Sequence, residues 1–174
     1  MHQKKYVKDL LERFKMTCCN DARSPLEVNV KLKIDEDEEG VNETDYRQLV
    51  GSLRFLCSSK PYLMFGVGLI SRFMCKPKKS HMTAAKCMLR YIKRTSDYGI
   101  LFPYGMKQEE LRLVGYTDSD FGGDQVERKS TSGNIFFLNK APISWSSKKQ
   151  TVIALSSCEA EYIAGCVAAV KGCG

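Results

Sequence analysis

The sequence predicts an α/β protein of the α+β kind, with a mainly helical first part and a second part built on a sheet with one helix. Apolar residues recur at helical spacing between residues 45 and 93, whereas strand-like apolar runs separated by turn residues follow residue 111. Residues 46–105 hold eleven basic residues and one acid, a net charge of +10, and residues 106–174 hold eight of each sign. We therefore predict two domains, residues 1–105 and 106–174, with their boundary near residues 103–110.

The chain of 174 residues is long enough to bury a core. It contains no apolar run of the roughly 18 residues that a membrane span needs. Its first residues, MHQKKYVKDLLERF, are charged and lack the apolar stretch of a signal peptide. We expect an intracellular protein, in the cytoplasm or nucleus, with no membrane partner. The eight cysteines form no C-x-x-C pair and have no histidine at metal-binding spacing, so reduced and mostly buried thiols are expected.

Short elements are predicted over the first 40 residues. Residues 3–7 are predicted as a short strand, and residues 8–16 as a helix with one buried face. Residues 26–34 (LEVNVKLKI) alternate apolar and polar side chains, which predicts an extended segment. Residues 35–40 (DEDEEG) form an acidic run that predicts a solvated loop.

A helix is predicted over residues 45–57, because its apolar residues recur at i, i+3, i+4 and i+7. Asn42 or Thr44 can cap its first turn. Prolines bound a second helix, which is predicted from residue 61 through residue 74.

A third helix, over residues 80–93, has an apolar face and a basic face. The residues predicted to point inward are Ala84, Ala85, Met88, Leu89 and Ile92. Dense positive charge is the usual footprint of a nucleic acid site, and the alternative is a set of solvated lysine faces. The candidate nucleic-acid-binding residues on and just before this helix are Lys78, Lys79, Lys86, Arg90, Lys93 and Arg94. A short strand or extended tail is predicted over residues 97–102.

The second domain is predicted to contain three strands and a helix. The strands cover residues 111–117, 131–138 and 141–146, with turns between them. The helix covers residues 158–171, with Ser156 or Ser157 as its cap. Its buried stripe is predicted to be Tyr162, Ile163, Cys166, Val167 and Val170.

Acidic residues at two places in the second domain are candidates for metal chemistry. Asp118 ends what we predict to be a central strand, and Asp120 and Asp124 follow it in a loop, where they offer the oxygen ligands that Mg²⁺ prefers. The alternative for this group is a turn rich in aspartate. Glu161 in the helix could share a metal ion with Asp118 for phosphoryl transfer, although helix capping alone also favours glutamate there and explains Glu159.

Seven strings of the chain carry a family resemblance. They are YRQLVGSLRFL (46–56), LISRFM (69–74), AAKCMLRYIKRTSDYGI (84–100), GYTDSDFGGD (115–124), RKSTSG (128–133), ISWSSKKQ (143–150) and ALSSCEAEYIA (154–164). Together they resemble the end of the Pol polyprotein of copia-type long-terminal-repeat retrotransposons, and the resemblance covers nearly the whole chain. It implies the thumb and connection region of a reverse transcriptase, followed by the start of a ribonuclease H domain.

For the second domain, the resemblance implies a ribonuclease H-like mixed sheet of five strands that is cut short in this chain. Such domains cleave the RNA strand of an RNA–DNA hybrid with Mg²⁺, and the resemblance implies that Asp118 and Glu161 are catalytic acids and metal ligands. Asp120 remains a further candidate ligand. An RNA–DNA hybrid or another nucleic acid is the expected partner, and the rest of the polyprotein is the ancestral one. Candidate backbone contacts in the second domain are Arg128, Lys129, Lys148 and Lys149.

The chain also departs from this family. It has no Tyr-x-Asp-Asp motif, so it is not expected to polymerise DNA, and the family's third catalytic aspartate would lie beyond Gly174. We expect a truncated ribonuclease H domain with little or no activity, because the acids that place the metal ions supply most of the catalysis. One alternative is a non-catalytic protein reused for nucleic-acid or host-protein interaction, including as a secreted effector-like factor. Another is an active nuclease completed by a second chain.

Overall fold

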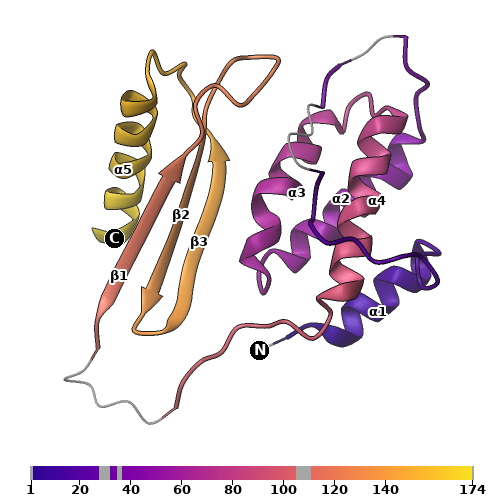
Figure 1. The fold of residues 1–174 in the computed structure, drawn as a ribbon, viewed down its shortest axis with the longest axis horizontal. Coiled ribbons are helices and arrows are strands. Elements are labelled where there is room, and N and C mark those ends of the chain that lie inside the picture. Colours follow the sequence, from indigo (N-terminus) through magenta and orange to yellow (C-terminus); the bar gives the residue numbers. More distant parts are fainter. Residues whose placement is uncertain (1, 28–31, 35–36, 105–110, 174) are drawn as a thin grey trace. The chain divides into compact units, whose positions relative to one another are not determined.

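The computed structural model describes residues 2–27, 32–34, 37–104 and 111–173. The chain forms two compact units, Met1–Gly99 and Ile100–Gly174 (Figure 1). The first unit is helical and the second contains the sheet, so the predicted α+β class is confirmed. Most of the predicted boundary segment lies outside the described residues, which stop at residue 104 and resume at residue 111.

The described part of the first unit contains four helices. They are α1 (Lys4–Arg13), α2 (Glu43–Leu56), α3 (Met64–Ile70) and α4 (Lys79–Arg94), with 3₁₀ turns at Pro61–Leu63 and Ser71–Phe73. Asn42 caps α2, because its side chain accepts a hydrogen bond from the Asp45 amide at 3.1 Å. The helices predicted over residues 45–57 and 80–93 are confirmed, whereas the helix predicted through residue 74 is divided into α3 and its two flanking turns.

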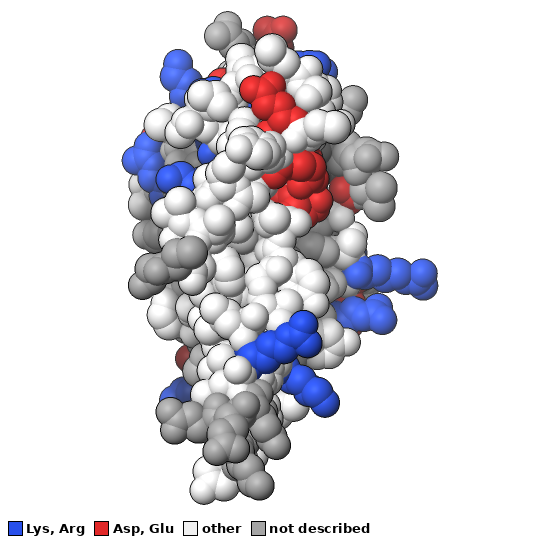
Figure 2. All heavy atoms as spheres, turned by 90° about the vertical axis from the view of Figure 1, so that its left-hand side faces the viewer, with Lys and Arg blue, Asp and Glu red and all other residues white. Residues whose placement is uncertain are grey.

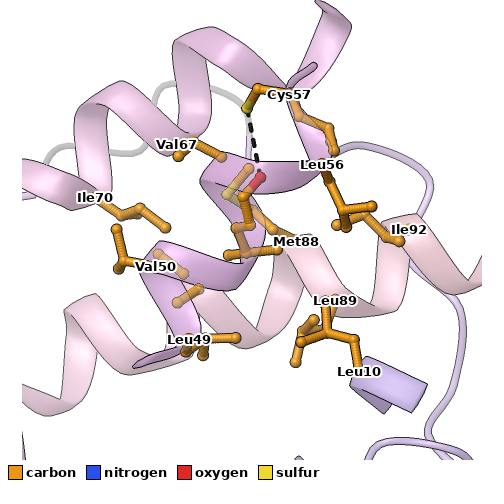
Figure 3. Packing of buried hydrophobic residues seen from close by; sticks show 14 of the residues in the cluster. Leu10, Leu49, Val50, Leu56, Cys57, Val67, Ile70, Met88, Leu89 and Ile92 are labelled. Atoms are coloured by element: carbon orange, nitrogen blue, oxygen red, sulfur yellow. Dashed lines mark hydrogen bonds between the residues drawn. The ribbon is translucent and has the colours of Figure 1, made fainter. Parts of the chain in front are cut away.

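Large apolar side chains form the core of the first unit (Figure 3). The fully buried members on α2 and α4 are Leu49, Leu53, Leu56, Ala85, Met88, Leu89 and Ile92. Tyr46 is fully buried with them, and its hydroxyl donates to the Ile70 carbonyl at 2.7 Å, so its polar atom is satisfied. The inward face that the sequence predicts for α4 is therefore confirmed.

The beginning of the chain differs from the prediction. Residues 3–7 are not a strand, because α1 begins at Lys4 and buries Val7 on the same face as Leu10 and Leu11. Residues that are three or four positions apart lie on the same face of a helix but not on the same face of a strand. The extended segment predicted over residues 26–34 falls partly outside the described residues, at 28–31.

The second unit contains a sheet whose described strands are all antiparallel, in the order β1-β2-β3. The strands are β1 (Leu113–Ser119), β2 (Thr131–Leu138) and β3 (Ala141–Lys149), and α5 (Ser157–Cys173) packs against β1 and β2 (Figure 1). Within the described residues the middle strand is β2, so β1, which the sequence predicts to be central, lies at the edge. Residues 97–102 form no strand.

A stripe of alanines packs α5 against the sheet. Ala160, Ala164 and Ala168 recur every four residues and are buried. The Phe136 ring of β2 lies close to both Gly115 of β1 and Gly172 of α5, and a Cβ atom on Gly115 would lie 2.7 Å from that ring. Close packing of this kind admits small helix residues and excludes large ones.

The apolar stripe predicted for α5 is therefore wrong. Tyr162 is 74% exposed and Val170 is 77% exposed, while Val167 and Cys166 are also exposed. On the side of the molecule that carries α5, acidic side chains gather toward the upper end, and a broad uncharged area lies below them (Figure 2). No helix in the described part of the chain is long and apolar enough to cross a membrane.

No disulfide joins the cysteines whose side chains the structure describes. Most of them are not buried, however, which corrects the expectation drawn from composition. Only Cys57, among those described, lies in a core, where burial raises the pKa of its thiol to about 11. Cys158 and Cys166 are exposed because they lie on α5 away from its alanine stripe.

Candidate functional site

Glu161 of α5 reaches the end of the strand that carries Asp118. Glu161, in the second turn of α5, accepts a hydrogen bond from the Ser119 backbone amide, with an Oε1–N distance of 3.1 Å. Ser119 directly follows Asp118 at the end of β1. The structure thus brings the neighbourhood of Asp118 to Glu161, and both carboxylates are exposed.

The start of α5 shows why Glu161 is available and Glu159 is not. The Glu159 amide donates to Ser156 Oγ at 3.1 Å, and the Leu155 amide donates to Glu159 Oε2 at 2.6 Å. The two bonds satisfy backbone donors at the helix N-terminus, as in a capping box, except that Glu159 accepts from the residue before the cap. Ser156 is thus the cap, and Glu159 has the capping role that the sequence predicts for it.

The Asp120 carboxylate is hydrogen-bonded to the backbone of a neighbouring strand. Its Oδ1 accepts from the Thr131 amide at 2.5 Å, and its own amide donates to the Thr131 carbonyl at 3.2 Å. Gly123 lies against the same carboxylate so closely that a Cβ atom there would overlap it. Within the described residues, no three His, Cys, Asp or Glu side chains are grouped closely enough to hold a metal ion. Glu161 contacts the residue after Asp118, whereas Asp120 is tied to the start of β2.

Asp124 is also engaged in structure. Its buried carboxylate accepts from Lys149 Nζ at 3.0 Å, and Glu127 bridges Lys149 and Lys129 at 2.5 and 2.7 Å. Burial lowers the pKa of Lys149, but hydrogen bonds to Glu127 and Asp124 outweigh it and raise the pKa overall. Two of the four candidate phosphate contacts in this unit, Lys129 and Lys149, are thus held in ion pairs.

Several basic residues of the first unit are engaged in the same way. Lys79 forms an ion pair with Glu39, and Lys78 Nζ donates to the Glu38 carbonyl at 2.6 Å. The Glu38 carboxylate accepts from the Ser80 amide at 2.5 Å, where a negative charge is favoured by the helix N-terminus. The acidic run predicted as a solvated loop therefore packs on the start of α4 in its described part.

The far end of α4 is tied to the segment before α2. Arg90 Nε donates to the Asn20 carbonyl at 2.7 Å, and Lys93 Nζ donates to the Cys19 carbonyl at 2.6 Å and lies 3.5 Å from Asp21. Five of the ten candidate contacts are exposed at the surface. They are Lys79, Lys86, Arg94, Arg128 and Lys148, and of these Lys79 is in the ion pair with Glu39.

Curated proteins from transposons are similar to this chain. It is 38% identical over 162 residues to the retrovirus-related Pol polyprotein from transposon RE1 of Arabidopsis thaliana, a match that covers 93% of this chain and 11% of that polyprotein. It is 37% identical over 171 residues to the retrovirus-related Pol polyprotein from transposon TNT 1-94 of Nicotiana tabacum, which covers 94% of this chain and 13% of that polyprotein. The chain belongs to the copia-type retrovirus-related Pol polyproteins.

The chain spans about a tenth of the length of these Pol polyproteins. A shorter relative is the secreted RxLR effector protein 161 of Plasmopara viticola, with 42% identity over 120 residues, which is 68% of this chain and 82% of that protein. No family model matches the chain, and no solved structure matches it.

The Pol segment contains a buried lysine whose role sequence reasoning missed. Lys60 belongs to the basic part of the chain but is fully buried, and its Nζ donates to the carbonyls of Thr95 and Tyr98 at 2.8 and 2.7 Å. These carbonyls lie at and after the C-terminal end of α4, so Lys60 satisfies acceptors that the helix leaves unpaired. Burial lowers its pKa, and Asp97 opposes that shift. Lys60 therefore contributes no surface charge for nucleic acid.

A second missed residue in the Pol segment is Gln150, the last residue of the SSKKQ string. Its side-chain amide contacts the end of β1, the start of β2 and the first turn of α5. The sequence offers a weak signal, which is a glutamine immediately after a strand that otherwise ends in lysines. Only the tertiary arrangement shows that it contacts Ser119 and Ala160, the sequence neighbours of the two acids.

Proposed function

We propose that the second unit carries the Asp118 and Glu161 side of a ribonuclease H-type site, which cleaves the RNA strand of an RNA–DNA hybrid. The observation that carries this proposal is the hydrogen bond from the Ser119 amide to Glu161. It connects the residue after Asp118, at the end of a strand, with Glu161 of a helix that lies 42 residues later in the sequence, and the carboxylates of Asp118 and Glu161 are both exposed. The transposon Pol relatives add support, because this chain matches part of a Pol polyprotein.

The acid pair suits Mg²⁺. This ion is usually held by one or two carboxylates together with substrate phosphate oxygens, and it keeps several waters. The Asp118 carboxylate has no hydrogen bond or ion pair to any residue that the structure describes, and Glu161 uses only Oε1 for the Ser119 amide. Carboxylate oxygens are therefore free to bind a metal ion. The ion would polarise the scissile phosphate and activate the attacking water.

The other side chains have supporting roles in the proposal. The Ser119 amide fixes the Glu161 carboxylate, so Glu161 meets the metal ion in one orientation. Arg128 and Lys148 are exposed in the same unit and can contact the nucleic acid backbone, as can Lys86 and Arg94 in the first unit. Lys129 and Lys149 maintain the loop after β1 through Asp124 and Glu127.

The test is cleavage of a hybrid labelled on its RNA strand, with Mg²⁺ or Mn²⁺ present. Because the proposed site rests on two acids rather than three, we expect slow cleavage that is lost in Asp118→Asn and Glu161→Gln. Glu159→Gln is the matched control, since it removes the same charge from the same helix at the capping position and should retain cleavage. Equal cleavage by all the variants would overturn the proposal, and so would cleavage of the DNA strand alone.

A second candidate function is binding without catalysis. It is favoured by the similarity to a secreted RxLR effector protein, of which the match covers 82%. In this case the chain binds nucleic acid or a host protein through its basic first unit. The Asp118→Asn variant would then bind a hybrid with the affinity of wild type, and neither protein would cleave it. Binding that weakens steeply with salt concentration would identify nucleic acid as the ligand.

A further inference from the structure

Gln150 lies behind the acid pair and contacts every element that holds it. The residue follows β3 and is only 6% exposed, and its backbone amide donates to the Ser130 carbonyl at 2.8 Å. The side-chain Nε2 lies 2.9 Å from Ser132 Oγ, 3.2 Å from Ser119 Oγ and 2.9 Å from the Ala160 carbonyl. Ser119 and Ala160 are the immediate neighbours of Asp118 and Glu161 in the sequence.

The orientation of this amide is set by its partners. The Ala160 carbonyl can only accept, so Nε2 and not Oε1 must face it. Ser119 Oγ can donate to the Asp120 carbonyl at 3.0 Å, which leaves its lone pairs to accept from Gln150. The Oε1 atom of Gln150 is buried and has no hydrogen-bond partner in the described part of the chain. An unpaired buried oxygen is unfavourable, so this orientation of the amide does not give the Gln150 side chain all the hydrogen bonds that it can form.

We propose that Gln150 is the positioning residue of the acid pair, holding the end of β1 and the first turn of α5 so that Asp118 and Glu161 face one metal ion. Its role in the reaction rests on the function proposed above, but the positioning itself does not. Without the Gln150 amide, the alanine stripe still attaches α5 to the sheet, but among the described residues only the Glu161 carboxylate then links the first two turns of α5 to Ser119. The stripe begins at Ala160 and continues toward the C-terminal end of the helix. The N-terminal end of α5, which carries Glu161, is therefore the part that would be held less firmly against β1.

The first test compares amide hydrogen exchange in the full chain of Gln150→Met and wild type. Methionine has a similar size and removes the amide donors along with the unpaired oxygen. The Ser119 amide should exchange about tenfold faster, because its bond to Glu161 is lost, while amides in the middle of β2 remain unchanged. The control is Asn134→Leu, which removes another buried amide whose Oδ1 accepts from Ser146 on β3. Asn134→Leu should leave the Ser119 amide as in wild type.

Unchanged exchange at Ser119 in folded Gln150→Met would overturn the proposal, as would an equal increase in Asn134→Leu. If Gln150→Met does not fold, Ser132→Ala supplies the test. It removes one acceptor of the Gln150 amide, and a smaller increase at Ser119 is expected. No increase in Ser132→Ala would then overturn the proposal.

The second test measures Mn²⁺ affinity. Gln150→Met should bind Mn²⁺ about tenfold more weakly than wild type, while its midpoint of thermal unfolding changes little, because relief of the unpaired oxygen offsets the lost hydrogen bonds. Wild-type affinity in Gln150→Met would overturn the positioning role. If wild type does not bind Mn²⁺, or if Asp118→Asn binds it equally well, the proposed function fails instead, and the Ser119 exchange still decides on positioning.

Discussion

The two units bury different kinds of side chain. The first unit packs leucine, isoleucine, methionine and tyrosine side chains from four helices into one core, and many of them are fully buried. The second unit attaches its helix through alanines and glycines, to a sheet face that includes the buried polar residues Ser132 and Asn134. Its larger apolar residues, such as Tyr116, Tyr162 and Val170, are instead exposed.

This difference separates the large buried side chains from the proposed acid pair within one chain. Burial of a large apolar side chain contributes roughly 1.5–3 kcal/mol, so the first unit has most of the residues that can stabilise a fold. The second unit uses short side chains and a polar interior to bring α5 close to β1, which places Glu161 at the Ser119 amide. We therefore expect the two units to respond differently to the same kind of substitution.

The largest effect is expected in the core of the first unit. Leu53→Ala removes a fully buried side chain and should lower the free energy of unfolding by about 2–5 kcal/mol, because it leaves a cavity. Urea unfolding followed by far-ultraviolet circular dichroism measures this loss. Leu155→Ala, at a residue that is 87% exposed, is the control and should have almost no effect. Equal losses in both variants would contradict the assigned core.

The next effect concerns the alanine stripe of α5. Ala164→Leu should lower the free energy of unfolding of the second unit by about 1–3 kcal/mol, because the added side chain cannot fit against the sheet. Trp145 is the only tryptophan and lies in β3, so its fluorescence reports on this unit. Ala169→Leu, on the exposed side of the same helix, should be nearly neutral. The stripe is wrongly assigned if Ala169→Leu is the more harmful change.

A third effect is pH-dependent and belongs to the first unit. His81 is fully buried, and its Nδ1 accepts from the Lys78 amide at 3.0 Å while Nε2 donates to the Lys33 carbonyl at 2.8 Å. Burial lowers the pKa of His81, and the Lys33 carbonyl and Glu38 only partly oppose this shift. The unfolded chain therefore binds a proton more readily than the folded chain, so stability is fully present above pH 6.5 and falls as the pH drops toward the lowered pKa.

Thermal unfolding between pH 7.5 and 5 checks this expectation for His81. His81→Gln keeps one donor and one acceptor without titrating, so this variant should lose less stability on acidification than wild type. The assignment of the pH dependence to His81 is wrong if both proteins lose the same amount. Exposed carboxylates titrate in both proteins and cancel in the comparison.

The smallest effect is expected on the outward face of α5. Val170→Ser should change the free energy of unfolding of the second unit by less than about 0.5 kcal/mol, because the side chain is 77% exposed. Trp145 fluorescence during urea unfolding measures it. A loss as large as that of Ala164→Leu would show that Val170 is buried in solution.

The sequence predicts the helical unit better than the sheet unit, for a physical reason. In α4 the inward residues are the most apolar ones, so hydrophobic periodicity identifies the buried face. In α5 the same rule predicts that Tyr162 and Val170 are buried. The helix instead buries alanines, because Phe136 leaves little space between the helix and the sheet. Strand β2 is predicted at its observed bounds, because its turn residues and apolar alternation are both local.

The candidate site is predictable only in part. Asp118 and Glu161 stand out through their positions at the end of a strand and the start of a helix, and the structure places Glu161 against the residue that follows Asp118. The environment of Asp120 depends on a loop that returns Thr131 to it, and the pairing of Lys149 depends on Asp124, 25 residues earlier. The burial of Lys60 likewise depends on the C-terminal end of α4. Such contacts between residues that are distant in the sequence cannot be predicted from residue type and spacing.

The most direct test of the acid pair is titration with Mn²⁺ observed by nuclear magnetic resonance, because this paramagnetic ion broadens the signals of nearby residues. We predict that the amides of Asp118, Ser119 and Glu161 broaden first, and that Asp118→Asn abolishes this broadening. Glu159→Gln should leave the pattern unchanged. Broadening centred on Asp124 and Glu127 would contradict the proposed acid pair, as would an unchanged pattern in Asp118→Asn.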